Sequence, residues 1–220
     1  MESLETELDR ARALDEADLA DAIETIGFEC TRCGACCTAE ADDPHTATVF
    51  PGEVRDLQDA TDYDFRDVAR PMPYGLTETD DGETTGETFE WALQTDGCGD
   101  CTFYTEDADG VGACTAHEDR PLVCRTYPFS VALGGTTQPM GEAVDEEGMV
   151  RAHECEGLGR DISRADAEDL AAALKTRAVR ELEEAIAVRD AYEPVSPDAG
   201  EVVVHDSEGQ KRPDGSPYDG

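Results

Sequence analysis

The chain has little positive charge to offer an anionic partner. Of its 220 residues only 17 are lysine or arginine, against 53 aspartates and glutamates, and the formal net charge is −36. Lysine is nearly absent, with Lys175 and Lys211 the only two. Nucleic acids and anionic membranes bind to basic surfaces. We therefore expect no nucleic-acid partner and no membrane partner.

Long apolar segments are also missing. No run approaches the roughly 18 consecutive apolar residues that read as a membrane-spanning helix. The charged stretch 1–12 has no apolar centre of the kind found in secretion signals. These absences predict a cytoplasmic protein, in which thiols stay reduced.

Familiar catalytic motifs and aromatic residues are scarce as well. The sequence has no G-x-G-x-x-G, Walker loop, H-E-x-x-H or G-x-S-x-G, which leaves open whether the protein is an enzyme. The only tryptophan, Trp91, alternates with Phe89 and Leu93 at a period of two. That pattern predicts a half-buried strand with Trp91 in the core.

The acidity has two interpretations. Intrinsic disorder is one of them. The other is a folded protein with a solvated acidic surface, suited to a salty cytosol that screens the repulsion between carboxylates. We favour the folded protein, because the acidic residues are spread through segments with clear helix and strand patterns.

Cysteine, in contrast, is abundant and clustered. Cys30, Cys33 and Cys36 have C-x2-C-x2-C spacing, and Cys37 follows at once. A C-x2-C turn brings two sulfurs close to one metal ion, and thiolates are the ligands that zinc and iron–sulfur clusters select. Disulfides are disfavoured, because the total of nine is odd and sequence neighbours such as Cys36 and Cys37 rarely pair.

A second group of cysteines lies downstream with C-x2-C-x12-C-x9-C spacing, and a ninth follows after it. We predict that all nine are metal ligands: Cys30, Cys33, Cys36, Cys37, Cys98, Cys101, Cys114, Cys124 and Cys155. They could form two four-coordinate sites with one thiol left over, or one cluster of about four ligands while the other thiols support it or bridge a second ion. The metal could be zinc or iron, including an iron–sulfur cluster, with iron slightly favoured.

Histidines and arginines near the cysteines are secondary candidates. His153 and, less so, His117 could ligate a metal, although a hydrogen-bonded or surface histidine is commoner. Arg32, Arg120 and Arg125 could offset the negative charge that thiolates place around a metal ion. Salt bridges to some of the many carboxylates are an equally good interpretation.

These motifs together resemble the YkgJ-type CxxCxxCC family over about residues 28–159. The resemblance rests on Phe28 before the cysteine run, the later cysteines, and Arg120-Pro121-x2-Cys124-Arg125-x-Tyr127-Pro128-Phe129. It implies a domain that chelates zinc or iron. Some flagellin lysine-methylating enzymes carry a similar cysteine pattern, which keeps an enzymatic role open. The acidity resembles that of haloarchaeal proteins.

The predicted fold is α+β: a small, metal-stabilised, cysteine-rich domain with a short antiparallel hairpin, irregular metal loops and flanking helices. We divide the chain into a helical segment (1–27), the metal-binding domain (28–160), a long amphipathic helix packing on it (161–192) and a disordered acidic tail (193–220), with at most a short strand at 202–204. The hairpin is expected over 75–95 with its turn near 80–82. The long helix is expected from Arg164 to Ala191.

Three functions fit these patterns. The first is a metal-binding protein that holds zinc or iron through clustered thiolates. The second is an iron–sulfur redox protein or a component of a protein-modifying enzyme. The third is an interaction module that docks through the helix at 164–191 onto a partner that the sequence does not identify.

Overall fold

The computed structural model describes residues 3–40, 44–79, 82–133, 143–145 and 148–218. Within them, helices combine with small sheets that are mostly antiparallel, which agrees with the predicted α+β class. The chain divides into two compact units. Unit 1 is Met1–Cys36, Thr105–Ala113 and Leu122–Glu183, and unit 2 is Cys37–Tyr104, Cys114–Pro121 and Glu184–Gly220.

Two helices begin unit 1, as the sequence predicts. The helix α1 (Leu4–Arg12) starts where the Ser3 hydroxyl accepts a hydrogen bond from the Thr6 N–H. Asp15 caps α2 (Glu16–Ile26) in the same way, since its carboxylate accepts from the Ala17 N–H at 2.8 Å. Gly27 ends α2 with φ 77°, a conformation that glycine adopts without strain.

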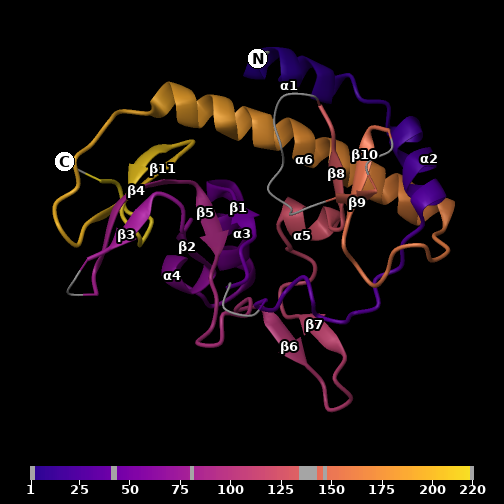
Figure 1. Cartoon of the computed structure of the whole chain (residues 1–220), viewed down its shortest axis with the longest axis horizontal. Coiled ribbons are helices and arrows are strands. Elements are labelled where there is room, and N and C mark those ends of the chain that lie inside the picture. Colours follow the sequence, from indigo (N-terminus) through magenta and orange to yellow (C-terminus); the bar gives the residue numbers. More distant parts are fainter. Residues whose placement is uncertain (1–2, 41–43, 80–81, 134–142, 146–147, 219–220) are drawn as a thin grey trace. The chain divides into compact units, whose positions relative to one another are not determined.

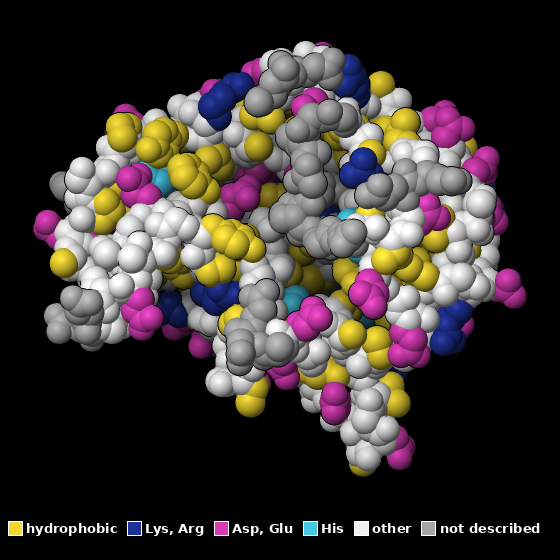
Figure 2. Space-filling model, in the orientation of Figure 1, with side chains coloured by type: hydrophobic (Ala, Val, Ile, Leu, Met, Phe, Trp, Pro, Cys, Tyr) yellow, Lys and Arg dark blue, Asp and Glu magenta, His cyan; other side chains and the backbone are white. Residues whose placement is uncertain are grey.

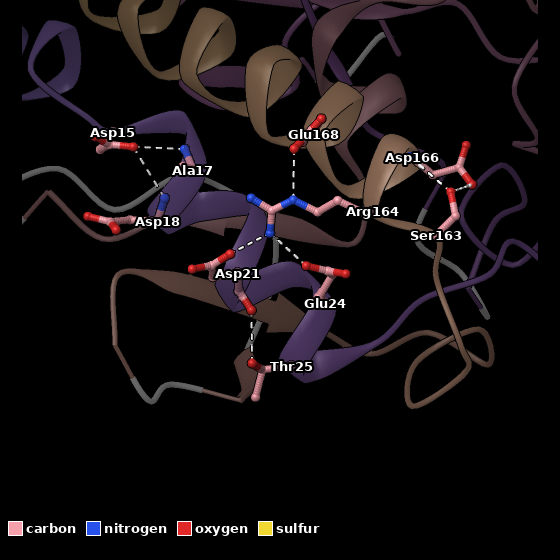
Figure 3. A network of polar contacts seen from close by, with 10 residues as sticks. All are labelled: Asp15, Ala17, Asp18, Asp21, Glu24, Thr25, Ser163, Arg164, Asp166 and Glu168. Carbon is pink, nitrogen blue, oxygen red and sulfur yellow. Dashed lines mark hydrogen bonds and ion pairs between the residues drawn. The ribbon is translucent and has the colours of Figure 1, made fainter.

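The long helix α6 (Arg164–Ala191) has the predicted bounds. Leu174, Ala178 and Leu182 of the predicted apolar stripe are buried. Figure 3 shows how the start of this helix is tied to α2: the Arg164 guanidinium donates to Asp21 and, at 2.6 Å, to Glu24. Further along, Arg12 of α1 pairs with Glu183 at 2.8 Å. These contacts tie the helix to the two N-terminal helices.

A three-stranded antiparallel sheet completes unit 1. Its order is β8 (Phe129–Val131), β10 (Val150–His153) and β9 (Ala143–Asp145). The helix α2 packs against β10, and in Figure 1 the short helix α5 (Leu122–Thr126) precedes β8 directly. Because α5 contains Cys124 and leads into β8, this cysteine lies beside the sheet of unit 1.

Unit 2 contains a buried three-stranded sheet of order β1 (Thr48–Val49), β5 (Trp91–Leu93) and β2 (Ala69–Pro71). Its helices are α3 (Pro51–Ala60) and α4 (Phe65–Val68). Trp91 is fully buried, as predicted, but Ala92 and Leu93 are buried too. The alternating strand is not observed, because Glu90 at φ 66° separates β5 from the preceding strand.

A second sheet in unit 2 has the order β12 (Gly209–Lys211), β11 (Val202–Asp206), β4 (Thr84–Phe89) and β3 (Leu76–Glu78). The strands β3 and β4 form a hairpin at the predicted place, but its second arm is Thr84–Phe89, whereas the sequence places that arm over residues 88–95; residues 80–81 of the turn lie outside the described residues. The sequence favoured disorder over 193–220. Instead, β11 pairs with β4 in parallel, and Val203 and Val204 are fully buried.

The remaining hairpin consists of β6 (Tyr104–Glu106) and β7 (Gly112–Cys114). Acidic side chains are scattered over the visible face of the molecule and do not gather in a single patch (Figure 2). In the part of the chain that the structure describes, no helix is long and apolar enough to cross a membrane.

Candidate metal centre

The nine cysteines all lie among the described residues and carry free thiols. They divide between the two units. Unit 1 has five, which are Cys30, Cys33, Cys36, Cys124 and Cys155, and unit 2 has four, which are Cys37, Cys98, Cys101 and Cys114. The boundary between the two units therefore falls inside the first cysteine motif, between Cys36 and Cys37.

In unit 1 the first cysteines and the last one are brought together by the backbone. Phe28 forms an antiparallel bridge with Leu158, and the Glu29 N–H donates to the Gly157 carbonyl at 3.0 Å. A Cβ on Gly157 would lie 2.3 Å from the Glu29 carbonyl oxygen, so only glycine permits this approach. Cys30 follows one of these paired segments and Cys155 precedes the other.

Three thiols of this group act electrostatically on the fourth, that of Cys155. Burial raises the pKa of Cys155, and the nearby thiols of Cys33, Cys36 and Cys30 raise it further. The Gly157 N–H donates to the Cys155 sulfur at 3.4 Å, which acts in the opposite direction. Since Coulomb interactions weaken with distance, the effect indicates that these four sulfurs share one neighbourhood. We call Cys30, Cys33, Cys36 and Cys155 the unit 1 thiol cluster.

Tyr127 borders this cluster. Burial raises the pKa of Tyr127 to about 12, and the charges of Cys155 and Cys36 contribute to the rise. Its hydroxyl donates to the carbonyl oxygen of Glu154, the residue before Cys155. Tyr127 therefore holds the Cys155 loop in place.

Cys124 is on α5, and a buried arginine supports the end of that helix. The Arg177 guanidinium of α6 donates to Thr126 Oγ1 at 3.0 Å and to the Phe129 carbonyl at 3.3 Å. The Phe129 ring also meets Phe28 edge-on, with centroids 5.6 Å apart. Sequence analysis missed Arg177. Its signal is a basic residue at a position between Leu174 and Ala178, on the apolar face of α6.

In unit 2, Cys98 and Cys101 lie on a tight turn. The Asp96 carboxylate accepts hydrogen bonds from the N–H groups of Cys98, at 2.8 Å, and Asp100, at 3.1 Å. Next to the turn, the Cys101 N–H donates to the Cys37 carbonyl at 2.8 Å. Cys37 and the C-x2-C turn are therefore neighbours, a grouping that the sequence left open.

The histidines and arginines named as secondary candidates mostly make hydrogen bonds to other protein groups. The His153 ring is buried and its Nε2 bonds Ser130 Oγ at 2.8 Å, while the exposed His117 bonds Arg120. Arg32 Nε donates to the Gly112 carbonyl at 2.9 Å. Arg125 is exposed and makes no hydrogen bond or ion pair with any described residue. None of the three arginines named above is paired with a carboxylate in the described part of the chain.

Most of the thiols are accessible. Cys30, Cys33, Cys36 and Cys98 are exposed, and Cys101 alone is buried. Within the described residues, no three His, Cys, Asp or Glu side chains are arranged to hold a metal ion. Ligation therefore requires the thiols to turn toward a common point, a change that exposed side chains on loops can make. The donors themselves fit zinc and iron, both of which take thiolate ligands.

Reduced cysteine clusters on irregular loops of a small α+β protein define a class that binds metal ions through thiolates. A family model described as "CxxCxxCC: Putative zinc- or iron-chelating domain" matches residues 29–156, which include all nine cysteines. The chain therefore belongs to the CxxCxxCC family, as the resemblance indicated. The comparisons with curated proteins and with solved structures found no match.

Proposed function

We propose that this protein reversibly chelates zinc or iron through the unit 1 thiol cluster. The observation that carries the proposal is the backbone pairing of two distant segments, in which the Glu29 N–H donates to the Gly157 carbonyl at 3.0 Å and the two segments that carry Cys30 and Cys155 are held together. The thiols of Cys33, Cys36 and Cys30 accordingly help to raise the pKa of Cys155. Four thiolates complete the coordination shell of zinc or of an iron–sulfur cluster. Cys124 is a fifth candidate in the same unit and could replace one of the four.

The exposure of the cluster supports metal handling. Cys30, Cys33 and Cys36 are exposed, so a competing ligand in solution can reach their sulfurs and exchange the metal. Each thiol loses its proton when it binds the metal, so uptake is coupled to pH. The site would carry a net charge of −2 with zinc and four thiolates, and Arg125, which has no described partner, is available to offset it.

An iron–sulfur cluster is the second candidate for the same site. The hydrogen bond from the Gly157 N–H to the Cys155 sulfur favours it, because such bonds tune the potential of these clusters. A redox or enzyme-associated role would follow. Docking through α6 has less support, since the apolar stripe of this helix is already buried against the protein's own residues.

Metal analysis of the whole chain tests the proposal. The protein is purified without oxygen at high salt, and metal content and visible absorption are measured for the wild type, Cys33→Ser and Cys155→Ser. Thr31→Ser serves as a control in the same loop. We expect bound zinc or iron in the wild type and the control, and a loss of at least half in both cysteine variants. Colour with acid-labile sulfide would identify the iron–sulfur form.

A wild-type protein without metal, or cysteine variants with full metal content, would remove the basis of the proposal.

The cellular location is also part of the proposal. We propose a reducing compartment, the cytoplasm, because nine free thiols would be oxidised elsewhere.

A further inference from the structure

The cysteine run contains a boundary that its spacing does not reveal. Cys36 belongs to unit 1, and the next residue, Cys37, belongs to unit 2. Three more cysteines accompany Cys37 in unit 2, which are Cys98, Cys101 and Cys114. We propose that these four thiols, named here the unit 2 thiol set, hold a second metal ion. The inference rests on the proposed function, since it takes the thiols as metal ligands.

The turn that carries Cys98 and Cys101 is shaped by bonds that involve no sulfur. The Asp96 carboxylate accepts from two N–H groups of the turn, and the Asp96 N–H donates to the Asp100 carbonyl at 2.8 Å. Gly99 supplies the left-handed conformation, with φ 88°. These bonds fix the backbone of the turn and, with it, the positions of Cys98 and Cys101.

The segment that contains Cys37 is fastened along this turn at three points. The Cys101 N–H donates to the Cys37 carbonyl at 2.8 Å. The Ala39 N–H donates to the Asp100 carboxylate at 2.7 Å, and the His45 N–H donates to the Gly99 carbonyl at 2.8 Å. A third cysteine is thereby held beside the C-x2-C pair by main-chain contacts.

Cys114 reaches the same region through the residues that follow Cys101. The Tyr104 N–H donates to the Cys101 carbonyl at 2.9 Å, which folds the chain back after the turn. The Phe103 carbonyl accepts from the Thr115 N–H at 2.8 Å, and the Phe103 side chain is buried. Thr115, the neighbour of Cys114, is therefore bonded to Phe103, which lies two residues after Cys101.

Hydrogen bonds thus connect the three segments of unit 2 that carry these four thiols, and the thiols would turn toward a common point to bind an ion. Four thiolates are a complete ligand set for a tetrahedral ion such as zinc or iron(II). On binding, four cysteine S–H groups release four protons and form four metal–sulfur bonds, with no change of oxidation state. The two cysteines at the end of the run would then serve different metal ions, and the protein would hold two ions rather than one.

Cadmium nuclear magnetic resonance tests this assignment on the whole wild-type chain. The protein is loaded with cadmium-113, which takes thiolate ligands in the manner of zinc, and each metal resonance is correlated with the cysteine Cβ protons bonded to it through sulfur. We expect two cadmium resonances. One should correlate with Cys37, Cys98, Cys101 and Cys114, and the other with cysteines of unit 1 only.

A single resonance, or one that correlates with cysteines of both units, would overturn the second site. A single cadmium bound only by unit 1 cysteines would also overturn it, while leaving the proposed function intact. If no cadmium binds at all, both proposals fail.

Native mass spectrometry gives an independent count. The double variant Cys98→Ser/Cys101→Ser should bind one zinc ion fewer than the wild type and retain the other. The matched variant Cys33→Ser/Cys36→Ser should lose the other ion instead. If either double variant loses both ions while its circular dichroism is unchanged, the two sites are not independent and the inference is wrong.

Discussion

Replacement of Arg177 by methionine should destabilise the protein and weaken metal binding at the same time. The Arg177 side chain is 1% exposed and pairs with Glu181 at 2.6 Å, a carboxylate that is 25% exposed. It also donates to Thr126 Oγ1 and to the Phe129 carbonyl. Methionine fills a similar volume but supplies none of these hydrogen bonds.

The expected cost follows from the groups left behind. The Phe129 carbonyl belongs to a residue that is 1% exposed, and an unpaired buried acceptor costs roughly 1–3 kcal/mol. Removing one member of a buried ion pair costs about 3–5 kcal/mol, but Glu181 can turn toward water and recover part of this. We therefore expect a loss of about 2–4 kcal/mol, or about 4–16 °C in the melting temperature.

The effect on metal binding comes from α5. Thr126 ends this helix and Cys124 lies within it, so loss of the bond from Arg177 frees the segment that presents the thiol. The assay combines thermal melting with a competitive zinc titration for Arg177→Met, with Arg180→Met as the control for the same chemical change at an exposed position of α6. Equal melting temperatures for the two variants would refute the reasoning.

Two further predictions concern unit 2. Val203→Ala or Val204→Ala should each cost about 2 kcal/mol in urea unfolding followed by Trp91 fluorescence, because both side chains are fully buried in β11. The half-buried Val202→Ala should cost much less, and three equal midpoints would mean that the C-terminal strands do not pack. Burial, aided by Arg70 and opposed by Asp100, lowers the pKa of His45 to about 4. The folded state thus binds the His45 proton less readily than the unfolded state, so stability should fall by roughly 3 kcal/mol as the pH drops from 6.5 to 4. His45→Gln should flatten this part of the pH profile, and an unchanged profile would contradict the assignment.

Local patterns were sufficient to place the helices. Each helix cap, at Ser3, Asp15 and Ser163, bonds an N–H only two or three residues further along the chain. For the same reason the hairpins at β3–β4 and β6–β7 could be predicted from their turn residues. Such short-range signals depend little on the rest of the chain.

Elements that depend on distant partners were predicted less well. The strand β11 looks like part of a polar tail, because its sequence says nothing of β4, the strand with which it pairs. The close backbone contact between Gly157 and Glu29 and the burial of Arg177 could not be predicted for the same reason, because both depend on distant partners. Each depends on a contact between residues more than one hundred positions apart or between separate elements.

The sequence by itself determined the chemistry of this protein. Nine cysteines with C-x2-C spacing, few basic residues and no catalytic motif indicated a thiolate metal binder of the CxxCxxCC family, because ligand type and short spacing are properties of the chain. Only the tertiary structure decided which thiols are neighbours. It placed Cys155 near Cys30, Cys33 and Cys36, and it put the consecutive residues Cys36 and Cys37 in different compact units. The reason is that long-range backbone pairing, and not distance along the chain, decides which side chains meet.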